Sequence, residues 1–418
     1  MRHYLIAALT STALVSPAFA ASPQEVAQTY VELAAAGYGD SLTTAQALQT
    51  AVDAFLKAPS EETHAAAKTA WLAARVPYQQ TEAFRFGNPI VDDWEGRVNA
   101  WPLDEGLIDY VDASYDHSQE NPLSTLNIVA NASFTLSGAQ VDATNLTPDF
   151  ISGTLHEVDG IEANVASGYH AIEFLLWGQD LNGTGPGAGA RSHTDYLQDS
   201  GCTNGNCDRR AAYLKAATDL LVTDLAYMAG QWAMGGEARS TITADPNAAL
   251  SAMLTGMGSL SYGELAGERM RLGVMLNDPE EEHDCFSDNT HNSHYYDGVG
   301  IRNVYLGSYT RVDGSVVSGP SLSALVASAD PAVDAQLKAE LDASVAALGA
   351  VKAAAESGMA YDQMLAAGNA EGEALIMGAV AALVTQTASI NRAVTVIGAS
   401  GVAIEGSDSL DNPGAVFQ

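Results

Sequence analysis

Basic residues are scarce in this sequence. The 418 residues include 18 lysines and arginines against 51 aspartates and glutamates, which gives a formal net charge of −33. A protein this acidic repels the phosphates of nucleic acids and anionic lipids, so its overall field excludes binding to either. The same field attracts cations. The charge therefore fits a cation-binding protein and, equally well, a protein that stays soluble in a saline environment.

Cysteine is nearly absent, with three residues in the whole chain. Cys202 and Cys207 flank Thr-Asn-Gly-Asn, a sequence typical of turns, and in an oxidising compartment they are expected to form a small local disulfide. A metal site built from this pair would lack the second cysteine pair that many structural zinc sites use. Cys285 is then left as a buried free thiol or as the partner in a different pairing.

Several catalytic motifs are missing. The sequence contains no His-Glu-x-x-His of the common zinc proteases, no Gly-x-Ser-x-Gly of serine hydrolases and no Cys-x-x-Cys-His for covalent haem. The glycine-rich segment 181–189 is not followed by Gly-Lys-Ser/Thr, which excludes that type of phosphate-binding loop. We expect this segment to be a surface connection, with a mobile flap as the functional alternative.

The first 20 residues have the pattern of a secretory signal peptide. Arg2 supplies the positive start, residues 4–15 supply the apolar region, and Ala18-Phe19-Ala20 is a small-x-small cleavage site. Cleavage is predicted after Ala20. The mature chain is therefore expected to be periplasmic or secreted, and any association with a membrane is expected to be peripheral.

Apolar residues recur at helical spacing over most of the remaining sequence, without a convincing alternating pattern for strands. This favours an all-α protein. Because 418 residues exceed one ordinary core, two helical-bundle domains are predicted, over 21–200 and 201–418. Segment 87–147 is rich in Pro, Asn, Asp and Gly and is expected to be irregular, folded over the end of a bundle. Helices are expected from Pro23 onward, over 43–56, 60–86, 149–178, 209–234 and 247–275, and over 331–398 with a break near Gly358.

The most informative stretch is 168–178, which is apolar and helix-favouring but contains His170 and Glu173. Three residues apart, these two side chains share one face of a helix and can converge on one metal ion. Their apolar neighbours predict a dry site, where an unpartnered carboxylate is costly and a cation is the simplest compensation. The alternative is a buried histidine that is satisfied by its neighbouring glutamate.

The same stretch carries a family resemblance. Gly168-x-His170-x-x-Glu173, followed by Phe-Leu-Leu-Trp-Gly, resembles the signature of the imelysin family. Four other segments resemble further blocks of that family in the right order, namely 77–87 (PYQQTEAFRFG), 101–104 (WPLD), 285–291 (CFSDNTH) and 300–307 (GIRNVYLG). The resemblance implies two four-helix-bundle-like domains with a polar cleft where they meet. It also implies an exported protein of bacterial iron uptake or regulation, although members are also labelled metallopeptidases.

Position in the family blocks adds five candidate residues to the cleft. Glu82 and Arg85 would come from the first domain, and Ser287, Asp288 and His291 from the second. A site of this kind lies between domains, which is a common place for ligand pockets.

The leading hypothesis is a periplasmic metal-binding protein of iron uptake that is not an enzyme. His170 and Glu173 bind iron or zinc, Asp288 or His291 completes the coordination, and Arg85 holds an anionic group. Free iron, haem and an iron chelate stay open as the ligand. The expected partner is a transport protein of the inner or outer membrane.

Two other hypotheses belong to different functional classes. The first is a zinc metallopeptidase with Glu82 or Asp288 as general base. Catalytic zinc keeps three protein ligands, and the sequence offers no second histidine at helical spacing, which argues against this hypothesis. The second is a metal-free protein that docks to a membrane partner or a redox protein through its acidic loops.

Overall fold

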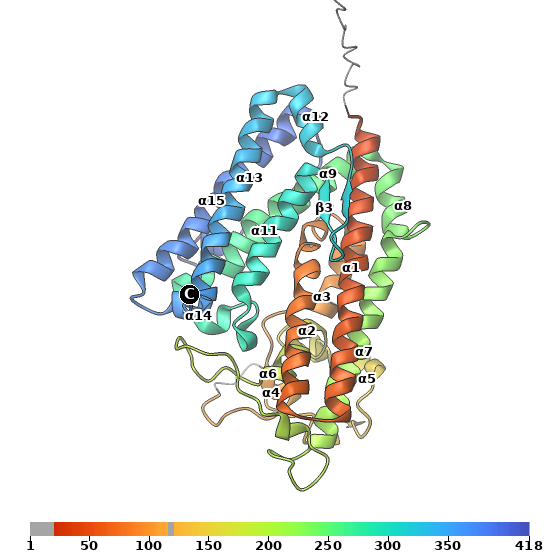
Figure 1. Cartoon of the computed structure of the whole chain (residues 1–418), viewed down its shortest axis with the longest axis vertical. Helices are drawn as coiled ribbons and strands as arrows, with labels where there is room; N and C mark the ends of the chain where they lie inside the picture. The colour runs from red at the N-terminus through yellow and green to blue at the C-terminus, as the bar shows by residue number, and fades with distance from the viewer. Residues whose placement is uncertain (1–20, 116–120, 418) are drawn as a thin grey trace, which may run out of the picture.

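The computed structural model describes residues 21–115 and 121–417. The predicted signal peptide and its cleavage site lie outside the described residues. Two helical bundles lie beside each other along the length of the molecule, and irregular connections gather at one end of the first bundle (Figure 1). The predicted all-α fold is confirmed, and the described part of segment 87–147 consists of short helices, a hairpin and loops.

The first bundle is assembled around its longest helix, α1. α2 and α7 pack along α1, so residues beyond position 200 contribute to this bundle. α8 contacts both α1 and α7, and α3 and α6 contact α7. The helices of this bundle are α1 (Pro23–Lys57), α2 (Glu61–Gln79), α3 (Pro89–Asn99), α6 (Gly168–Trp177), α7 (Cys207–Trp232) and α8 (Glu237–Ala244).

α1 begins at a capping box. The Ser22 hydroxyl accepts a hydrogen bond from the Glu25 N–H, and the Glu25 carboxylate accepts one from the Ser22 N–H. The prediction of a separate helix over 43–56 is wrong, because α1 continues without a break through Gly37 and Gly39. Packing against α2 and α7 outweighs the low helix propensity of these glycines.

The second bundle pairs α13 with α15 and adds α11 and a π-helical segment, η5. α15 is long and apolar enough, by composition, to cross a membrane. In this structure it packs along α13 and η5 and buries Ile376, Leu383 and Ile390, which is the behaviour of a core helix. The elements are α9 (Pro246–Ser259), η5 (Leu260–Arg271), α10 (Leu272–Leu276), α11 (Thr290–Leu306), α12 (Leu322–Ala329), α13 (Pro331–Glu356), α14 (Tyr361–Leu365), α15 (Ala370–Ile397) and α16 (Asp408–Asp411).

Two short antiparallel hairpins were not predicted. β1 (Ser133–Leu136) pairs with β2 (Ala139–Asp142), and β3 (Ser308–Thr310) pairs with β4 (Val316–Ser318). Strands of three or four residues are too short to show a clear alternation in the sequence. Each hairpin connects or covers helices and neither forms a core sheet.

The helix predicted over 149–178 is also wrong, because only its last third is one helix. Glu157 and Asp159 have positive φ values, which end any helix before them, and α6 starts afresh at Gly168. The remaining short elements of the connections are α4 (Glu105–Ile108), α5 (Pro148–Phe150), η1 (Glu82–Phe84), η2 (Ile151–Leu155), η3 (Val158–Gly160), η4 (His193–Tyr196), η6 (Pro279–Glu281) and η7 (Cys285–Ser287).

The two bundles meet where α2 contacts α11. At the same junction η7 contacts α6, the helix that carries the motif 168–178. Chain segments that are about a hundred residues apart in the sequence are thereby brought to one place, and the candidate site lies there.

Candidate metal centre

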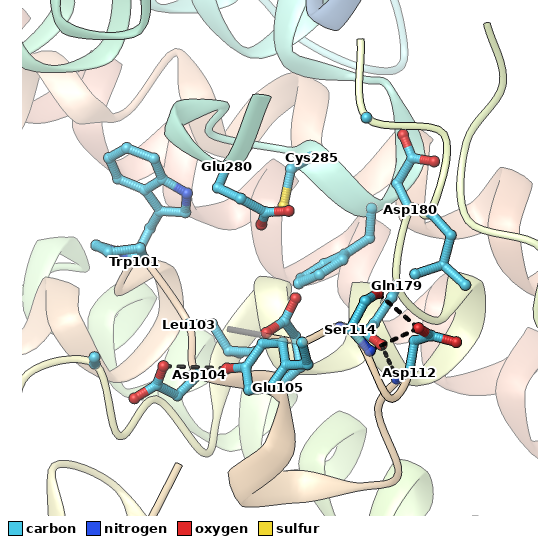
Figure 2. Close-up of a pocket in the computed structure, with 16 residues that line it drawn as sticks. Trp101, Leu103, Asp104, Glu105, Asp112, Ser114, Gln179, Asp180, Glu280 and Cys285 are labelled. Carbon is cyan, nitrogen blue, oxygen red and sulfur yellow. Dashed lines mark hydrogen bonds between the residues drawn. The ribbon is translucent and has the colours of Figure 1, made fainter. Parts of the chain in front are cut away.

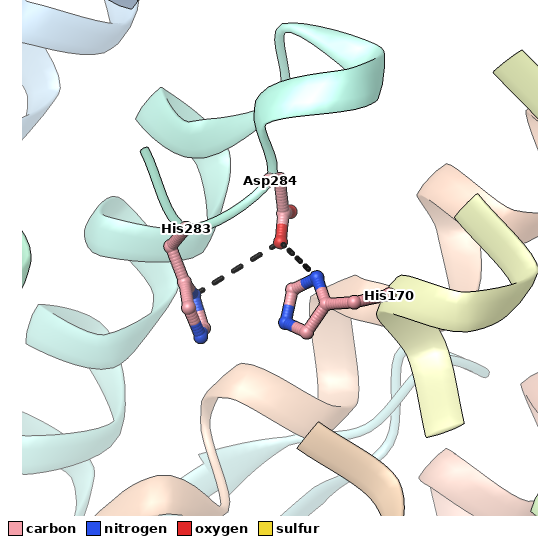
Figure 3. Close-up of side chains that lie close together, drawn as sticks. All are labelled: His170, His283 and Asp284. Atoms are coloured by element: carbon pink, nitrogen blue, oxygen red, sulfur yellow. Dashed lines mark ion pairs between the residues drawn. The ribbon is translucent and has the colours of Figure 1, made fainter. Parts of the chain in front are cut away.

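Three buried side chains converge at this junction. His170 comes from α6, and His283 and Asp284 come from the segment between η6 and η7 (Figure 3). Ligand atoms of the three residues all lie within 4.8 Å of one another. Asp284 Oδ1 lies 3.9 Å from His170 Nδ1 and 4.0 Å from His283 Nδ1. We call these three residues the triad. Two imidazoles and one carboxylate form a ligand set that iron and zinc both accept.

α6 is fixed in place by its first residues. Gly168 has φ +82°, and a Cβ at this position would lie 2.4 Å from the carbonyl oxygen of Val98, so only glycine allows the approach. The Trp71 indole N–H donates to the Tyr169 carbonyl at 3.0 Å. Every residue of α6 is buried, which leaves His170 1 % exposed. His170 is therefore held on a rigid, dry element.

Asp284 is positioned by residues at the start of α11, and the His283 ring by α2, where Gln79 Nε2 lies 3.3 Å from His283 Nδ1. The Asp284 N–H donates to the Thr290 hydroxyl at 3.0 Å, and the Asn289 side-chain amide donates to Asp284 Oδ2 at 2.7 Å. The Ser293 hydroxyl also donates to Oδ2. These bonds aim Oδ1 of Asp284 toward the two imidazoles.

Arg75 of α2 supplies the positive charge that faces Asp284. Its Nη2 lies 2.6 Å from Asp284 Oδ1 and its Nε lies 3.3 Å from Oδ2, with both side chains 1 % exposed or less. Its Nη1 donates to the Asn99 side chain at 2.6 Å. Burial alone would raise the pKa of Asp284, but the charge of Arg75 prevails and the pKa falls to about 2. The Asp284 carboxylate is thus ionised at neutral pH.

Both histidines are neutral at neutral pH. Burial lowers the pKa of His170 to about 3, and the charge of Arg75 adds to the effect. Burial also lowers the pKa of His283 well below its ordinary value, with further contributions from Arg269 and His170. Neutral imidazole is the form that binds metals, so protons do not compete for these nitrogens at neutral pH.

Glu173 lies directly beside the triad. Its Oε2 is 3.1 Å from His170 Nδ1, and its Oε1 accepts hydrogen bonds from Ser287 through the N–H at 3.0 Å and the hydroxyl at 2.6 Å. No described residue hydrogen-bonds the other ring nitrogen of His170, Nε2, although that atom is buried. With Nδ1 protonated toward Glu173, the lone pair on Nε2 is available to a metal, as in carboxylate–histidine–metal arrangements.

Of the candidates from the family blocks, Ser287 alone contacts the pair that the motif predicted, because it holds Glu173. The structure does not bring Asp288 or His291 to the triad. Asp288 has φ +55°, which turns the chain away from the triad. Burial, together with the charges of neighbouring carboxylates, raises the pKa of Asp288 to about 7. His291 Nε2 lies 3.0 Å from the Asn292 side chain instead.

Glu82 and Arg85 belong to a separate, partly buried network of charges. Glu82 accepts from Arg269 at 2.8 Å, and Arg85 pairs with Asp92 at 2.9 Å and with Glu95 at 3.5 Å. These partners satisfy Arg85 internally, so the predicted role of holding an anionic group for the metal site does not fit this geometry.

Sequence reasoning missed His283, Asp284 and Arg75. The first two directly precede the segment 285–291 that was quoted for its resemblance, and the adjacency of a histidine to an aspartate was an available signal. Arg75 lies seven residues before Glu82 on the predicted helix 60–86, and an arginine directly after Trp-Leu-Ala-Ala was the only sign. Its partner is 209 residues away in the sequence, which no local pattern reveals.

Comparison with known proteins identifies the family. The model of the family described as Imelysin matches residues 34–390. This chain belongs to the imelysin family. The resemblance found in the sequence is thereby confirmed over most of the chain.

Related imelysin-like structures share the fold. A protein described as an iron-regulated protein A precursor from Parabacteroides distasonis superposes with a TM-score of 0.64 at 20 % identity, covering 91 % of this chain and 97 % of the other. An imelysin-like protein from Psychrobacter arcticus gives a TM-score of 0.54 at 14 % identity over 90 % and 97 % of the two chains. At these identities the likeness establishes the fold alone.

One curated relative of this imelysin-family chain has a name that refers to iron. Iron-regulated protein A from Synechococcus elongatus is 34 % identical over 85 residues, which are 20 % of this chain and 22 % of that protein. The matched part is thus less than a quarter of the relative. Together with the family, these names support an iron-related protein.

The disulfide that the sequence analysis expected is present. Cys202 and Cys207 are joined in a disulfide at the start of α7. Cys285 is a free cysteine of intermediate exposure, next to Asp284. Burial and the surrounding carboxylates raise the pKa of its thiol well above the ordinary value, so it carries no charge that would attract a metal at neutral pH.

Proposed function

We propose that this protein binds one metal ion at the triad and serves iron acquisition as an exported binding protein without catalytic activity. The observation that carries the proposal is the convergence of His170, His283 and Asp284 within 4.8 Å in a buried site. His170 and His283 are neutral and Asp284 is ionised at neutral pH, so all three are in the state that binds metal.

The residues present fit a metal better than they fit an ordinary buried network. His170 Nε2 has no hydrogen-bond partner among the described residues, and a buried imidazole nitrogen without a partner is costly. Glu173 orients His170 through Nδ1, which is the second-shell arrangement typical of metal-binding histidines. Glu173 as a direct ligand stays a prediction. Its Oε1 already accepts hydrogen bonds from Ser287, and its Oε2 faces Nδ1 of His170.

Iron is the metal that we propose. A set of two histidines and one carboxylate suits iron(II) and zinc alike, so the donor atoms alone do not distinguish them. The names of the Synechococcus and Parabacteroides proteins refer to iron regulation, which favours iron for this chain as well. Haem is not part of the proposal, because His170 and His283 are each 1 % exposed and present no open face to a porphyrin.

Arg75 sets the charge balance of the proposed site. In the metal-free protein its guanidinium neutralises Asp284, and a bound dication would share that carboxylate with it. Two positive groups near one carboxylate repel each other, so Arg75 limits the affinity of the site. A limited affinity suits a protein that must also release its metal to a membrane transport protein, the partner we propose.

A zinc metallopeptidase is the alternative that the number of ligands favours. Three protein ligands with one open position are typical of catalytic zinc. Burial argues against it, because a peptide bond must reach the metal and the members of the triad are 1 % exposed or less. We expect no cleavage of peptides by the zinc-loaded protein. Chelator-sensitive cleavage that is lost in Glu173→Gln would instead favour the peptidase.

Export is part of the proposal and is supported by the signal-like pattern of residues 1–20. It predicts that the protein recovered from its host lacks these residues. N-terminal sequencing of that protein tests the point, and an N-terminus at Ala21 is expected. A protein that begins at Met1 and stays in the cytoplasm would contradict it.

Anaerobic titration of the purified protein with iron(II) and with zinc(II) tests the proposed site. We expect one tight site in the wild type and its loss in His283→Ala and in Asp284→Asn. His64→Ala is a matched control, because His64 is also buried but its Nε2 lies 2.8 Å from the Leu176 carbonyl oxygen, outside the triad. Equal binding in all four proteins would refute the triad as the site.

A further inference from the structure

An acidic cavity of about 480 Å³ lies next to the triad and plays no part in the proposed function. Figure 2 shows Glu280 and Cys285 on one side of it and Asp104 and Glu105 across from them, with Asp180 at one end. The glycine-rich segment 181–189 contributes part of the wall. No lysine, arginine or histidine of the described chain lines this cavity.

The partners of these carboxylates are neutral groups. Asp104 accepts from the Asn121 amide and from the Tyr115 hydroxyl. Asp180 accepts from the Asn182 side chain at 2.7 Å. No ion pair to either aspartate or to Glu280 is found within residues 21–115 and 121–417. Among the residues that the structure describes, no cation balances the negative charge of the cavity.

Glu282 provides an independent sign of a missing cation. It lines a small extension of the cavity together with Asp180 and Glu280. Its side chain is 1 % exposed, and its buried Oε2 has no hydrogen-bond partner among the described residues. A buried carboxylate oxygen without a partner is costly, and a bound cation removes that cost.

We propose that this cavity is a second cation site, which holds a hydrated divalent cation between Asp180, Glu280 and Glu282. Ligands that are all oxygen select hard cations. Within the described chain these carboxylates do not come as close together as the members of the triad do, so they do not enclose a bare ion. Asp180 and Glu280 line the large cavity, whose volume of about 480 Å³ holds an ion with several of its waters, each of which occupies about 30 Å³. Glu282 lies in the small extension, whose volume of about 10 Å³ has room for about one water that links its carboxylate to the ion. The proposal does not depend on a metal at the triad.

The cavity and the triad are neighbouring but separate. Trp101 lines the cavity, and its ring centroid is 5.9 Å from that of His283. Cys285, which also lines the cavity, follows Asp284 in the sequence. The indole of Trp101 therefore lies between the two sites, close enough to the cavity to transfer excitation energy to a luminescent lanthanide bound there.

Manganese binding tests the second site, with free Mn²⁺ counted by electron paramagnetic resonance. Glu280→Gln/Glu282→Gln is the test variant. Glu61→Gln/Glu62→Gln is the control, because Glu61 and Glu62 are exposed on α2 and their replacement removes the same amount of charge. We expect affinity at one Mn²⁺ site to fall about tenfold or more in the test variant, since ligand charge sets affinity at such sites, and to stay unchanged in the control. Ca²⁺ should compete.

Equal Mn²⁺ binding in the two double variants would overturn the proposal, because only the overall charge would then matter. Binding that survives in Glu280→Gln/Glu282→Gln but is lost in Asp284→Asn would also overturn it, and would assign all of the Mn²⁺ to the triad. Conversely, Mn²⁺ binding that is lost in Glu280→Gln/Glu282→Gln would support the second site even if titration showed that the triad binds no metal.

Terbium luminescence on the wild-type fold gives a second, independent measurement. The emission of Tb³⁺ bound in the cavity should be sensitised by Trp101, lost in Trp101→Phe and removed by Ca²⁺. It should persist in Asp284→Asn, which excludes the triad, because Trp101 also lies near His283. This measurement keeps the proposal testable if the glutamate variants fold poorly. Sensitised emission that is unchanged in Trp101→Phe would overturn the proposal, because the lanthanide would then lie elsewhere.

Discussion

Replacing Arg75 by Met separates the two roles that the structure gives to this residue. The methionine side chain is unbranched and apolar, so it occupies part of the same space but lacks the cation that faces Asp284. It also lacks the hydrogen bond that Arg75 donates to the Asn99 side chain. The substitution leaves Asp284 as a buried carboxylate whose remaining partners are Asn289 and Ser293. In the metal-free protein this is the loss of one partner from a buried ion pair.

Such a loss lowers the free energy of unfolding by about 3–5 kcal/mol, because the charge of Asp284 stays buried without a compensating cation. A metal at the triad supplies a new positive charge to the same carboxylate. With ligand at about 100 times its dissociation constant, binding adds about 2.7 kcal/mol to the stability of any folded protein that has the site. Without the repulsion from Arg75 the metal binds more tightly, so its stabilising effect is larger in the variant than in the wild type.

Urea unfolding with a chelator and with saturating iron(II) measures both effects. We expect the free energy of unfolding of Arg75→Met to lie about 3–5 kcal/mol below that of the wild type without metal, and the difference to be smaller with metal, because the variant binds the metal more tightly. Arg210→Met is the control, because Arg210 pairs with Asp109 in an equally buried place away from the triad. A loss in Arg75→Met that is the same with and without metal would refute the reasoning.

Three further predictions concern the surroundings of the triad. Ser287→Ala removes the hydroxyl that donates to Glu173 and should cost about 1–3 kcal/mol and about tenfold in metal affinity, measured by unfolding and titration. Burial lowers the pKa of His64 from 6.5 to about 4, so the unfolded chain takes up the proton before the folded chain does as the pH falls. Between pH 7 and pH 4 the free energy of unfolding of the wild type should therefore fall by about 3 kcal/mol more than that of His64→Gln. Parallel pH profiles of the two proteins would contradict this. Gly168→Ala should lower the stability by about 2 kcal/mol or more, because the new Cβ strains the backbone and collides with α3. Gly138 has the same φ of +82° but open space around it, so Gly138→Ala should lower the stability less. Equal losses of stability in thermal unfolding would disprove the close approach.

The fold could be predicted from the sequence where helical periodicity is long and well capped. α13 begins at Pro331 after the capping residue Asp330, and α15 ends before Gly398, close to the predicted limits. The errors have local causes that periodicity does not show. α1 runs through two glycines because its neighbours hold it, and the helix predicted from 149 is broken by the positive φ of two acidic residues.

The candidate site could be predicted only in part. The pattern of His170 and Glu173 on a buried helix was correct, because three-residue spacing fixes the relation between the two side chains. His283 and Asp284 reach His170 across more than a hundred residues of sequence, through tertiary contacts such as that between η7 and α6. Local spacing says nothing about such a contact, so the sequence suggested Asp288 or His291 to complete the coordination by His170 and Glu173, whereas the side chains that converge on His170 are those of His283 and Asp284.

Elemental analysis of the protein purified from its own host tests the central claim most directly, with wild type, His283→Ala and the His64→Ala control prepared in parallel. The account predicts about one equivalent of iron per chain in the wild type and in the control, and none in His283→Ala, because the site needs all three of its ligands. Wild-type protein without metal, or the same metal content in His283→Ala, would contradict it.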